Sequence, residues 1–184
     1  MTIIFYKTLL TEAKDLSPTE RIIYSFLVSK SITLISELFD VDGTCLDVVE
    51  LYSLVEDDNW IDLYYMNNTQ IAQKLNIARK TVTRSIEKLK SLGYIKGEYI
   101  CVTKELLEKG YFELHRLDML TGELAIFYSY IKHKSLRFGG CVDTYKTKLA
   151  ELLATTKVAI SKLLNRLYAL NLAKRLDNGK LLVL

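Results

Sequence analysis

The stretch TQIAQKLNIARKTVTRSIEKLKSLGYIK (69–96) decides the fold of this 184-residue chain. The spacing of its apolar residues predicts a short helix over about 69–75, a turn at 76–78 and an amphipathic helix over 79–92. Gly93 suits the left-handed conformation that commonly ends a helix. The stretch therefore predicts two helices joined by a tight turn.

The second of these helices has two unlike faces. Val82, Ile86 and Leu89 follow one another at i, i+4 and i+7, so they are expected to face a core. The opposite face is mainly basic and carries Arg79, Lys80, Thr83, Arg84 and Lys88.

The same pattern occurs again later in the chain. TKLAELLATTKVAISKLLNRLYALNLAK (147–174) aligns without a gap at an offset of 78, and Asn171 takes the place of Gly93. Upstream, LSPTERIIYSFLVSK (16–30) aligns with LTGELAIFYSYIKHK (120–134) at an offset of 104. The difference between the offsets predicts a 26-residue insertion in the first copy.

Each copy is expected to begin with a capped helix. Ser17-Pro18-Thr19-Glu20 has the form of a capping box with proline at the first helical position, and this helix should run to about Lys30. Thr121 occupies the same cap position in the second copy.

Each copy is also expected to end with a β-hairpin. Residues 94–96 and 99–102 flank Gly97-Glu98, which suits a type II′ turn. Residues 172–176 and 180–184 flank Asn178-Gly179, which suits a type I′ turn.

The composition fits a globular, mainly helical protein of one or two domains. Apolar residues make up 49% and charged residues 26%, with only one proline and eight glycines. No apolar run is long enough for a membrane span, and the N-terminus lacks the pattern of a secretion signal. These features predict a cytoplasmic protein.

The sequence contains no pattern that indicates catalysis or metal binding. The three cysteines lie far apart without a CxxC pair, so free thiols are expected. We find no P-loop, G-x-S-x-G or H-E-x-x-H motif. The sequence therefore predicts no catalytic residues, no cofactor and no metal.

Charge is unevenly distributed along the chain. Residues 31–68 contain nine acidic and no basic residues, whereas residues 69–104 contain eight basic and two acidic ones. A basic block beside an acidic one suggests a surface that binds a polyanion, and the alternative is that both blocks are solvated helix faces.

The acidic block coincides with the predicted insertion. Val48, Leu51, Tyr52 and Val55 form a helical stripe, and residues 60–66 alternate like the first strand of a hairpin sheet. Its charge should keep this segment away from phosphates, at a protein interface or in solvent, and covering the basic face as an autoinhibitor is the alternative.

The order of helix, short helix, tight turn, amphipathic helix and hairpin occurs twice, and here the chain resembles the winged helix-turn-helix family in tandem. The resemblance implies a mainly α fold with small β-hairpin wings. The first domain would cover residues 1–104, with the insertion at about 31–66, and the second would cover residues 105–184.

The resemblance implies a non-enzymatic protein that binds double-stranded DNA sequence-specifically, with transcriptional regulation as the leading role and a homodimer as a possible state. The chain also resembles plasmid replication initiators, which bind origin repeats. A third alternative is a tandem winged-helix scaffold that acts through protein contacts, as in chromosome-segregation complexes.

A basic helix that enters the major groove reads bases with its first turns. Arg79 and Lys80 can donate to guanine, Thr81 can contact a base or a thymine methyl, and Lys88 is expected to contact phosphate. In full, the predicted DNA-binding residues of the first copy are Arg79, Lys80, Thr81, Thr83, Arg84 and Lys88, and those of the second are Lys157, Ser161, Lys162, Arg166, Arg175 and Lys180. For the second copy, a dimerisation or scaffold role stays open.

Overall fold

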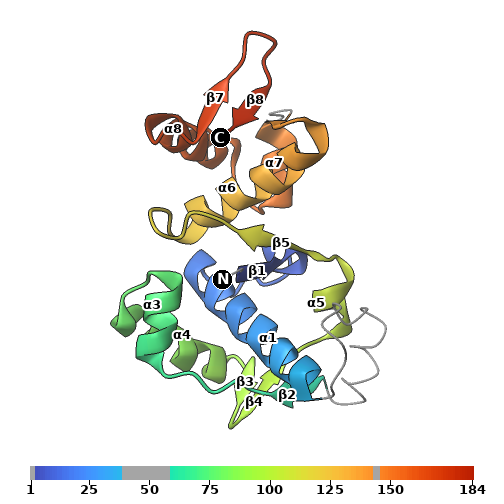
Figure 1. Ribbon diagram of the computed structural model, residues 1–184, viewed down its shortest axis with the longest axis vertical. Helices are drawn as coiled ribbons and strands as arrows, with labels where there is room; N and C mark the ends of the chain where they lie inside the picture. The colour runs from blue at the N-terminus through green and yellow to red at the C-terminus, as the bar shows by residue number, and fades with distance from the viewer. Residues whose placement is uncertain (1–2, 39–58, 143–145) are drawn as a thin grey trace.

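The computed structural model describes residues 3–38, 59–142 and 146–184, which form two halves stacked along the long axis (Figure 1). The N-terminal half contains β1 (Ile3–Tyr6), the 3-10 helix η1 (Lys7–Leu10), α1 (Pro18–Leu38), β2 (Trp60–Asp62), α3 (Asn68–Leu75), α4 (Arg79–Ser91), β3 (Ile95–Lys96) and β4 (Tyr99–Cys101). A connecting segment follows, with α5 (Lys104–Glu108) and β5 (Tyr111–Leu114). The C-terminal half contains α6 (Gly122–Ser135), η2 (Leu136–Phe138), β6 (Cys141–Val142), α7 (Lys146–Leu152), α8 (Lys157–Ala169), β7 (Ala173–Arg175) and β8 (Leu181–Val183).

Within the described residues, the two halves share one order of elements. In each, a long helix is followed by a strand, two helices and a hairpin, from α1 to β4 and from α6 to β8, where the C-terminal half has in addition the 3-10 helix η2 after α6. The small antiparallel sheets also have matching strand orders, β2-β4-β3 and β6-β8-β7. The mainly helical fold with small hairpins therefore agrees with the expectation from the sequence.

Helix α1 begins as predicted and ends later. Ser17 and Glu20 form the capping box, with the Ser17 N–H donating to the Glu20 carboxylate at 2.7 Å. The helix continues past Lys30, its predicted end, to Leu38, so the first residues of the predicted insertion extend α1. The reason is visible at Ser31, which is fully buried and accepts a hydrogen bond from the Tyr64 N–H at 2.9 Å.

A Tyr-Ser pair makes equivalent hydrogen bonds in the two long helices, α1 and α6. The hydroxyl of Tyr24 on α1 donates to the Cys101 carbonyl of β4, and the hydroxyl of Tyr128 on α6 donates to the Leu184 carbonyl just after β8. Each tyrosine thus fixes the hairpin of its half to the long helix. Burial raises the pKa of Tyr24 well above its usual value, so this hydroxyl keeps its proton.

The neighbouring serines hold two strands. Ser25 accepts from the Tyr6 N–H of β1 at 3.1 Å, and Ser129 accepts from the His115 N–H just after β5 at 2.8 Å. Both serine side chains are fully buried. The recurrence of Tyr24-Ser25 as Tyr128-Ser129 in the sequence therefore reflects two buried hydrogen bonds in each half.

The sequence did not predict the sheet between β1 and β5. These strands pair antiparallel, with Ile3 opposite Leu114 and Tyr6 opposite Tyr111. Strand β1 also packs on α1, while β5 leads into α6, so the sheet lies between the two halves (Figure 1).

The other predicted elements within the described residues agree with the structure in type, with two differences. Strand β2 is the expected first strand of the hairpin sheet but covers only Trp60–Asp62 of the predicted 60–66. The second hairpin does not have the type I′ turn. The predicted helical stripe from Val48 to Val55 lies outside the described residues, so it stays a prediction.

In the turn of the second hairpin Gly179 has a positive φ of 78° and Asn178 does not. The Gly179 N–H donates to the Leu176 carbonyl, and the Leu176 N–H donates to the Lys180 carbonyl. This pattern indicates a three-residue loop with a glycine bulge, because the Asn178 side chain accepts from the Lys180 N–H and needs no left-handed backbone of its own.

Candidate nucleic-acid interface

Helices α3 and α4 form a helix-turn-helix unit on the side of α1. Asn67 caps α3 through a reciprocal capping box with Gln70. The turn is sharp because Asn76 adopts the left-handed conformation, with φ 52° and ψ 46°. Gly93, with φ 81°, ends the unit in the left-handed conformation expected from the sequence.

Helix α4 buries one face and exposes its basic one. Val82, Ser85 and Leu89 are buried against α1 and α3. Four of the predicted DNA-binding residues are exposed on the other side, and these are Arg79, Lys80, Thr81 and Arg84. Their basic side chains are available to a polyanion.

Two further predicted residues of α4 are engaged within the protein. The hydroxyl of Thr83 accepts from the Asn68 side-chain amide at 2.9 Å and donates to the Arg79 carbonyl at 3.1 Å. The Lys88 ammonium forms an ion pair with the Glu20 carboxylate at 2.9 Å. Base or phosphate contacts by these two side chains stay predictions, and each would require an internal bond to be shared or opened.

The Glu20–Lys88 ion pair affects the pKa of Glu20. Burial opposes ionisation of Glu20, but the hydrogen bond from Lys88 and those from Ser17 outweigh it and lower the pKa of Glu20 below its usual value. Lys88 therefore links α4 to the first turn of α1.

The exposed face of α4 also carries one acidic residue, which is not among the predicted site residues. Glu87 lies one turn after Arg84 and is exposed. The spacing could have revealed it, because residues three apart on a helix share a face. Its charge makes the C-terminal part of this face less suitable for phosphate than the first two turns.

Helix α8 presents a second basic face. Lys157, Lys162 and Arg166 are exposed, whereas the hydroxyl of Ser161 donates to the Lys157 carbonyl at 3.0 Å. Thr156 is the N-cap of α8, and its hydroxyl accepts from the Ala159 N–H at 3.1 Å.

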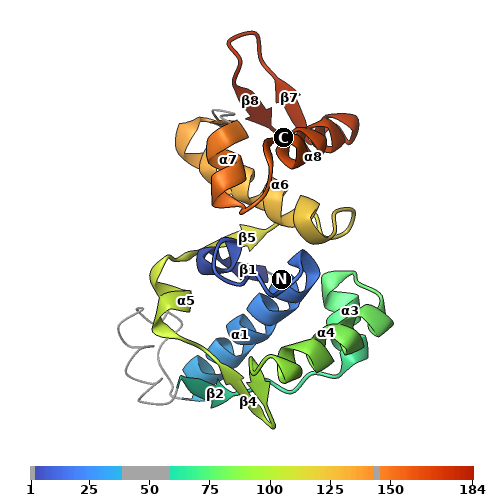
Figure 2. The same ribbon diagram turned by 180° about the vertical axis from the view of Figure 1, so that it is seen from behind.

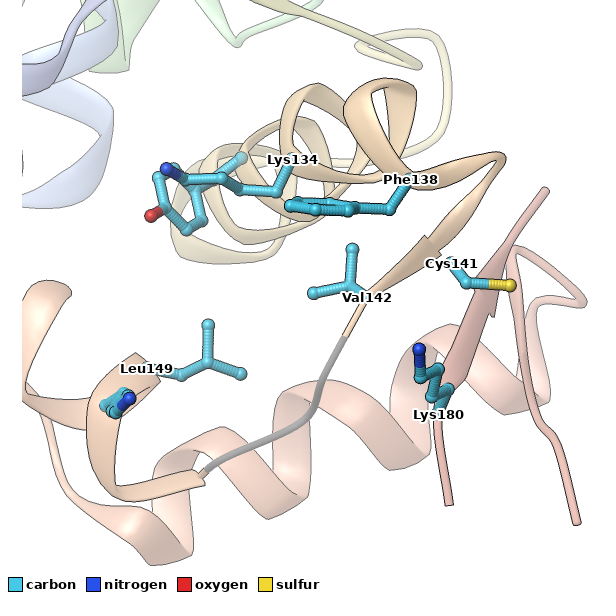
Figure 3. Close-up of a pocket in the computed structure, with 8 residues that line it drawn as sticks. Lys134, Phe138, Cys141, Val142, Leu149 and Lys180 are labelled. Atoms are coloured by element: carbon cyan, nitrogen blue, oxygen red, sulfur yellow. The ribbon is translucent and has the colours of Figure 1, made fainter. Parts of the chain in front are cut away.

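The two predicted residues of the second hairpin lie on either side of its turn. Arg175 closes β7 and is exposed, and Lys180 follows the turn and is also exposed. Figure 3 shows that Lys180 also borders a pocket with Lys134 and Phe138. Lys134 and Lys180 border this pocket from different elements, Lys134 from α6 and Lys180 from the turn end of the second hairpin.

The structure does not gather the twelve residues into one cluster. Helices α4 and α8 lie in different halves, but both lie on the same side of the long axis, as the opposed views of Figures 1 and 2 agree. The basic residues of α4 and α8 thus form two separate patches, one in each half.

Residues 65–96 match the family model described as winged helix-turn-helix DNA-binding. The match covers α3, the turn, α4 and the start of the first hairpin, which is the unit predicted from the sequence. No curated protein and no solved structure matches the chain. Among the helices of the described residues, none combines the length and apolar character that a bilayer crossing demands.

Proposed function

We propose that this protein binds double-stranded DNA sequence-specifically and regulates transcription. The observation that carries the proposal is the exposed basic face at the start of α4, within the segment that matches the winged helix-turn-helix model. A helix presented in this way fits the major groove of B-DNA, where arginine and lysine recognise guanine edges.

The proposed roles follow from exposure. Arg79 and Lys80 would reach base edges, with Thr81 and Arg84 beside them. Lys162 and Arg166 of α8, with Lys157, would contact phosphates of the same duplex. Arg175 and Lys180 of the second hairpin would contact the backbone or the minor groove.

We propose two winged helix-turn-helix domains in tandem, residues 1–104 and 105–184. The repeated order of elements and the matching strand orders of the two small sheets support this division. We assign the protein no enzymatic activity, and a homodimer on DNA and a cytoplasmic location complete the proposal. A selected site that recurs near a replication origin would favour replication initiation over transcription.

The test is the salt dependence of duplex binding. Contacts to about five to eight phosphates predict a slope of log K against log salt of about −4.5 to −7. Fluorescence anisotropy with a labelled duplex from a binding-site selection measures this slope. A flat line, or no binding at low salt, would refute DNA binding and leave the scaffold alternative.

A matched pair of lysine variants locates the contacts. Lys80→Ala should lower the affinity for DNA, because Lys80 is exposed on the proposed interface. Lys14→Ala removes the same charge from an exposed position before α1 and should leave the affinity within about twofold after allowance for long-range charge. Equal losses in both variants would show that only the overall charge matters.

A further inference from the structure

We infer that α4 and α8 act on one duplex as a rigid pair, so that α8 contacts the phosphate backbone at a single fixed distance from the bases that α4 recognises. This inference rests on the proposed function. It adds that the connecting segment, residues 104–121, is a spacer of fixed shape and not a flexible linker.

The first support is the sheet between β1 and β5. Four residue pairs join the strands, from Ile3–Leu114 to Tyr6–Tyr111, and the rings of Phe5 and Phe112 lie 5.2 Å apart between centroids. Phe112 also contacts the Tyr130 ring of α6 at 5.8 Å. One aromatic cluster thus spans the N-terminal half, the connecting segment and the C-terminal half.

The second support is that each strand is bonded to a long helix. Ser25 of α1 holds the Tyr6 N–H of β1, and Ser129 of α6 holds the His115 N–H after β5. Both serine side chains are fully buried, so breaking either bond would separate a backbone N–H from an acceptor that water does not readily replace. The sheet therefore cannot turn on either helix without loss of these bonds.

The third support lies at the helix-turn-helix unit itself. The side-chain amide of Asn76 donates to the carbonyls of Leu117 and Asp118, at 2.9 and 3.1 Å. Asn76 is the residue that makes the turn between α3 and α4. The connecting segment is thus attached directly to the unit that presents α4.

The same segment enters α6 against the start of α1. Leu120 is buried, and at Gly122 a Cβ would lie 3.6 Å from the Thr19 hydroxyl, in ordinary contact. The first turns of α1 and α6 are therefore neighbours, and bonds and packing hold the halves together at three places.

The relative placement of the two basic helices then has a consequence for DNA. Helices α4 and α8 lie on the same side of the long axis, one in each half (Figures 1 and 2). A duplex running along this side would meet both. Because the halves cannot reorient freely, α8 contacts the backbone only at one distance and one rotational phase from the bases that α4 recognises.

The experiment uses the full chain and the duplex obtained by binding-site selection, with hydroxyl-radical footprints locating the regions that the two helices protect. The duplex is then shortened in steps from the end on the α8 side. A rigid pair predicts a second protected region at one fixed distance from the first. It also predicts a single sharp loss of affinity, of about 100-fold, when the shortening removes that region.

The alternatives give different results. A second protected region spread along the backbone, with a gradual loss of affinity on shortening, would show a flexible tether and overturn the inference. Affinity that is unchanged after removal of all DNA outside the α4 region would show that α4 alone holds the duplex, which also overturns the inference while leaving DNA binding by α4 intact. Absence of binding to any duplex at low salt would overturn the proposed function as well.

A pair of variants tests the spacer directly. Asn76→Gly keeps the left-handed turn but removes the two bonds to Leu117 and Asp118, so it should lower the affinity for the full duplex and leave that for the duplex shortened to the α4 region unchanged. Asn171→Gly makes the same change at another left-handed position, φ 54°, in the C-terminal half and should alter neither affinity. Identical behaviour of the two variants in both assays would count against a rigid spacer.

Discussion

Helices α4 and α8 follow the same kind of turn in the two halves, yet their first turns are built differently. Helix α8 begins after Thr156, whose hydroxyl accepts from the Ala159 N–H. Helix α4 begins after Ala78, which has no side-chain acceptor to offer. A threonine cap stabilises a helix by about 1 kcal/mol relative to alanine, so α4 lacks a stabilising contribution that α8 has.

The charges in these turns increase the contrast. Helix α4 starts with Arg79 and Lys80, two cations at the end of the helix where the macrodipole is positive and cations are unfavourable. Helix α8 has only Lys157 there, followed by Val158, which is 64% exposed. The two cations in the first turn of α4 therefore lower the stability of this helix. A bound phosphate would offset their repulsion with the helix macrodipole.

In their later turns the two helices differ in acidic residues. Glu87 interrupts the exposed face of α4, whereas Asn165 stands at the aligned position of α8, which contains no acidic residue. Helix α4 thus has two adjacent cations in its first turn, whereas the cations of α8 are single residues spaced along the helix. This difference suggests that α4 recognises bases over a short stretch and that α8 holds the backbone.

The largest expected effect of this difference is on sequence preference. Arg79→Ala and Arg84→Ala should erode the preference for the selected duplex over random DNA by about 1–3 kcal/mol each, the value of a good base contact. Lys162→Ala and Arg166→Ala should weaken binding to both duplexes, keep their ratio, and reduce the salt slope by about one each. Paired titrations on specific and random duplexes measure both quantities. Loss of the ratio in the α8 variants alone would mean that the two helices have exchanged roles.

The helix-turn-helix unit was predictable because its signals are local. The cap at Asn67, the left-handed residues Gly93 and Asn171, and the apolar spacing that buries Val82 all act within a few residues of the chain. Such signals need no knowledge of the rest of the fold. The family-model match to residues 65–96 covers the same stretch.

What the sequence missed depends on distant partners. Strand β1 pairs with β5, which lies more than a hundred residues later in the chain. No local turn motif joins the two strands, so the sequence near either strand does not indicate its partner. The ion pair of Lys88 was not predicted for the same reason, because its partner Glu20 lies on another helix, far away in the sequence. Lys88 was expected to contact phosphate because periodicity assigns a face to a residue but not the neighbour that the face meets.

A smaller effect, on folding stability, should follow from the caps. Thr156→Ala should lower the free energy of unfolding by about 1 kcal/mol, because the Ala159 N–H loses its acceptor. Ala78→Ser should raise it by about 0.5–1 kcal/mol, since residue 78 already has the extended backbone of a cap, with φ −60° and ψ 134°. Urea unfolding followed by circular dichroism measures both changes. Thr156→Ser is the control, and a loss as large as that of alanine would show that the hydroxyl bond is not the source.

The smallest expected effect concerns the Glu20–Lys88 link between α1 and α4. Glu20→Gln keeps a side chain able to complete the capping box with Ser17 but removes the charge that faces Lys88, so it should lower the free energy of unfolding at neutral pH by less than about 1 kcal/mol. The pKa of Glu20 is lowered in the folded protein, so the unfolded chain binds more protons as the pH falls. The stabilising contribution is therefore complete above the ordinary glutamate pKa and is lost as the pH falls through the lowered one. Urea midpoints of wild type and Glu20→Gln should differ at about pH 7 and converge as the pH falls below the lowered pKa of Glu20. A difference that persists at low pH would show that packing, and not the ion pair, joins the two helices here.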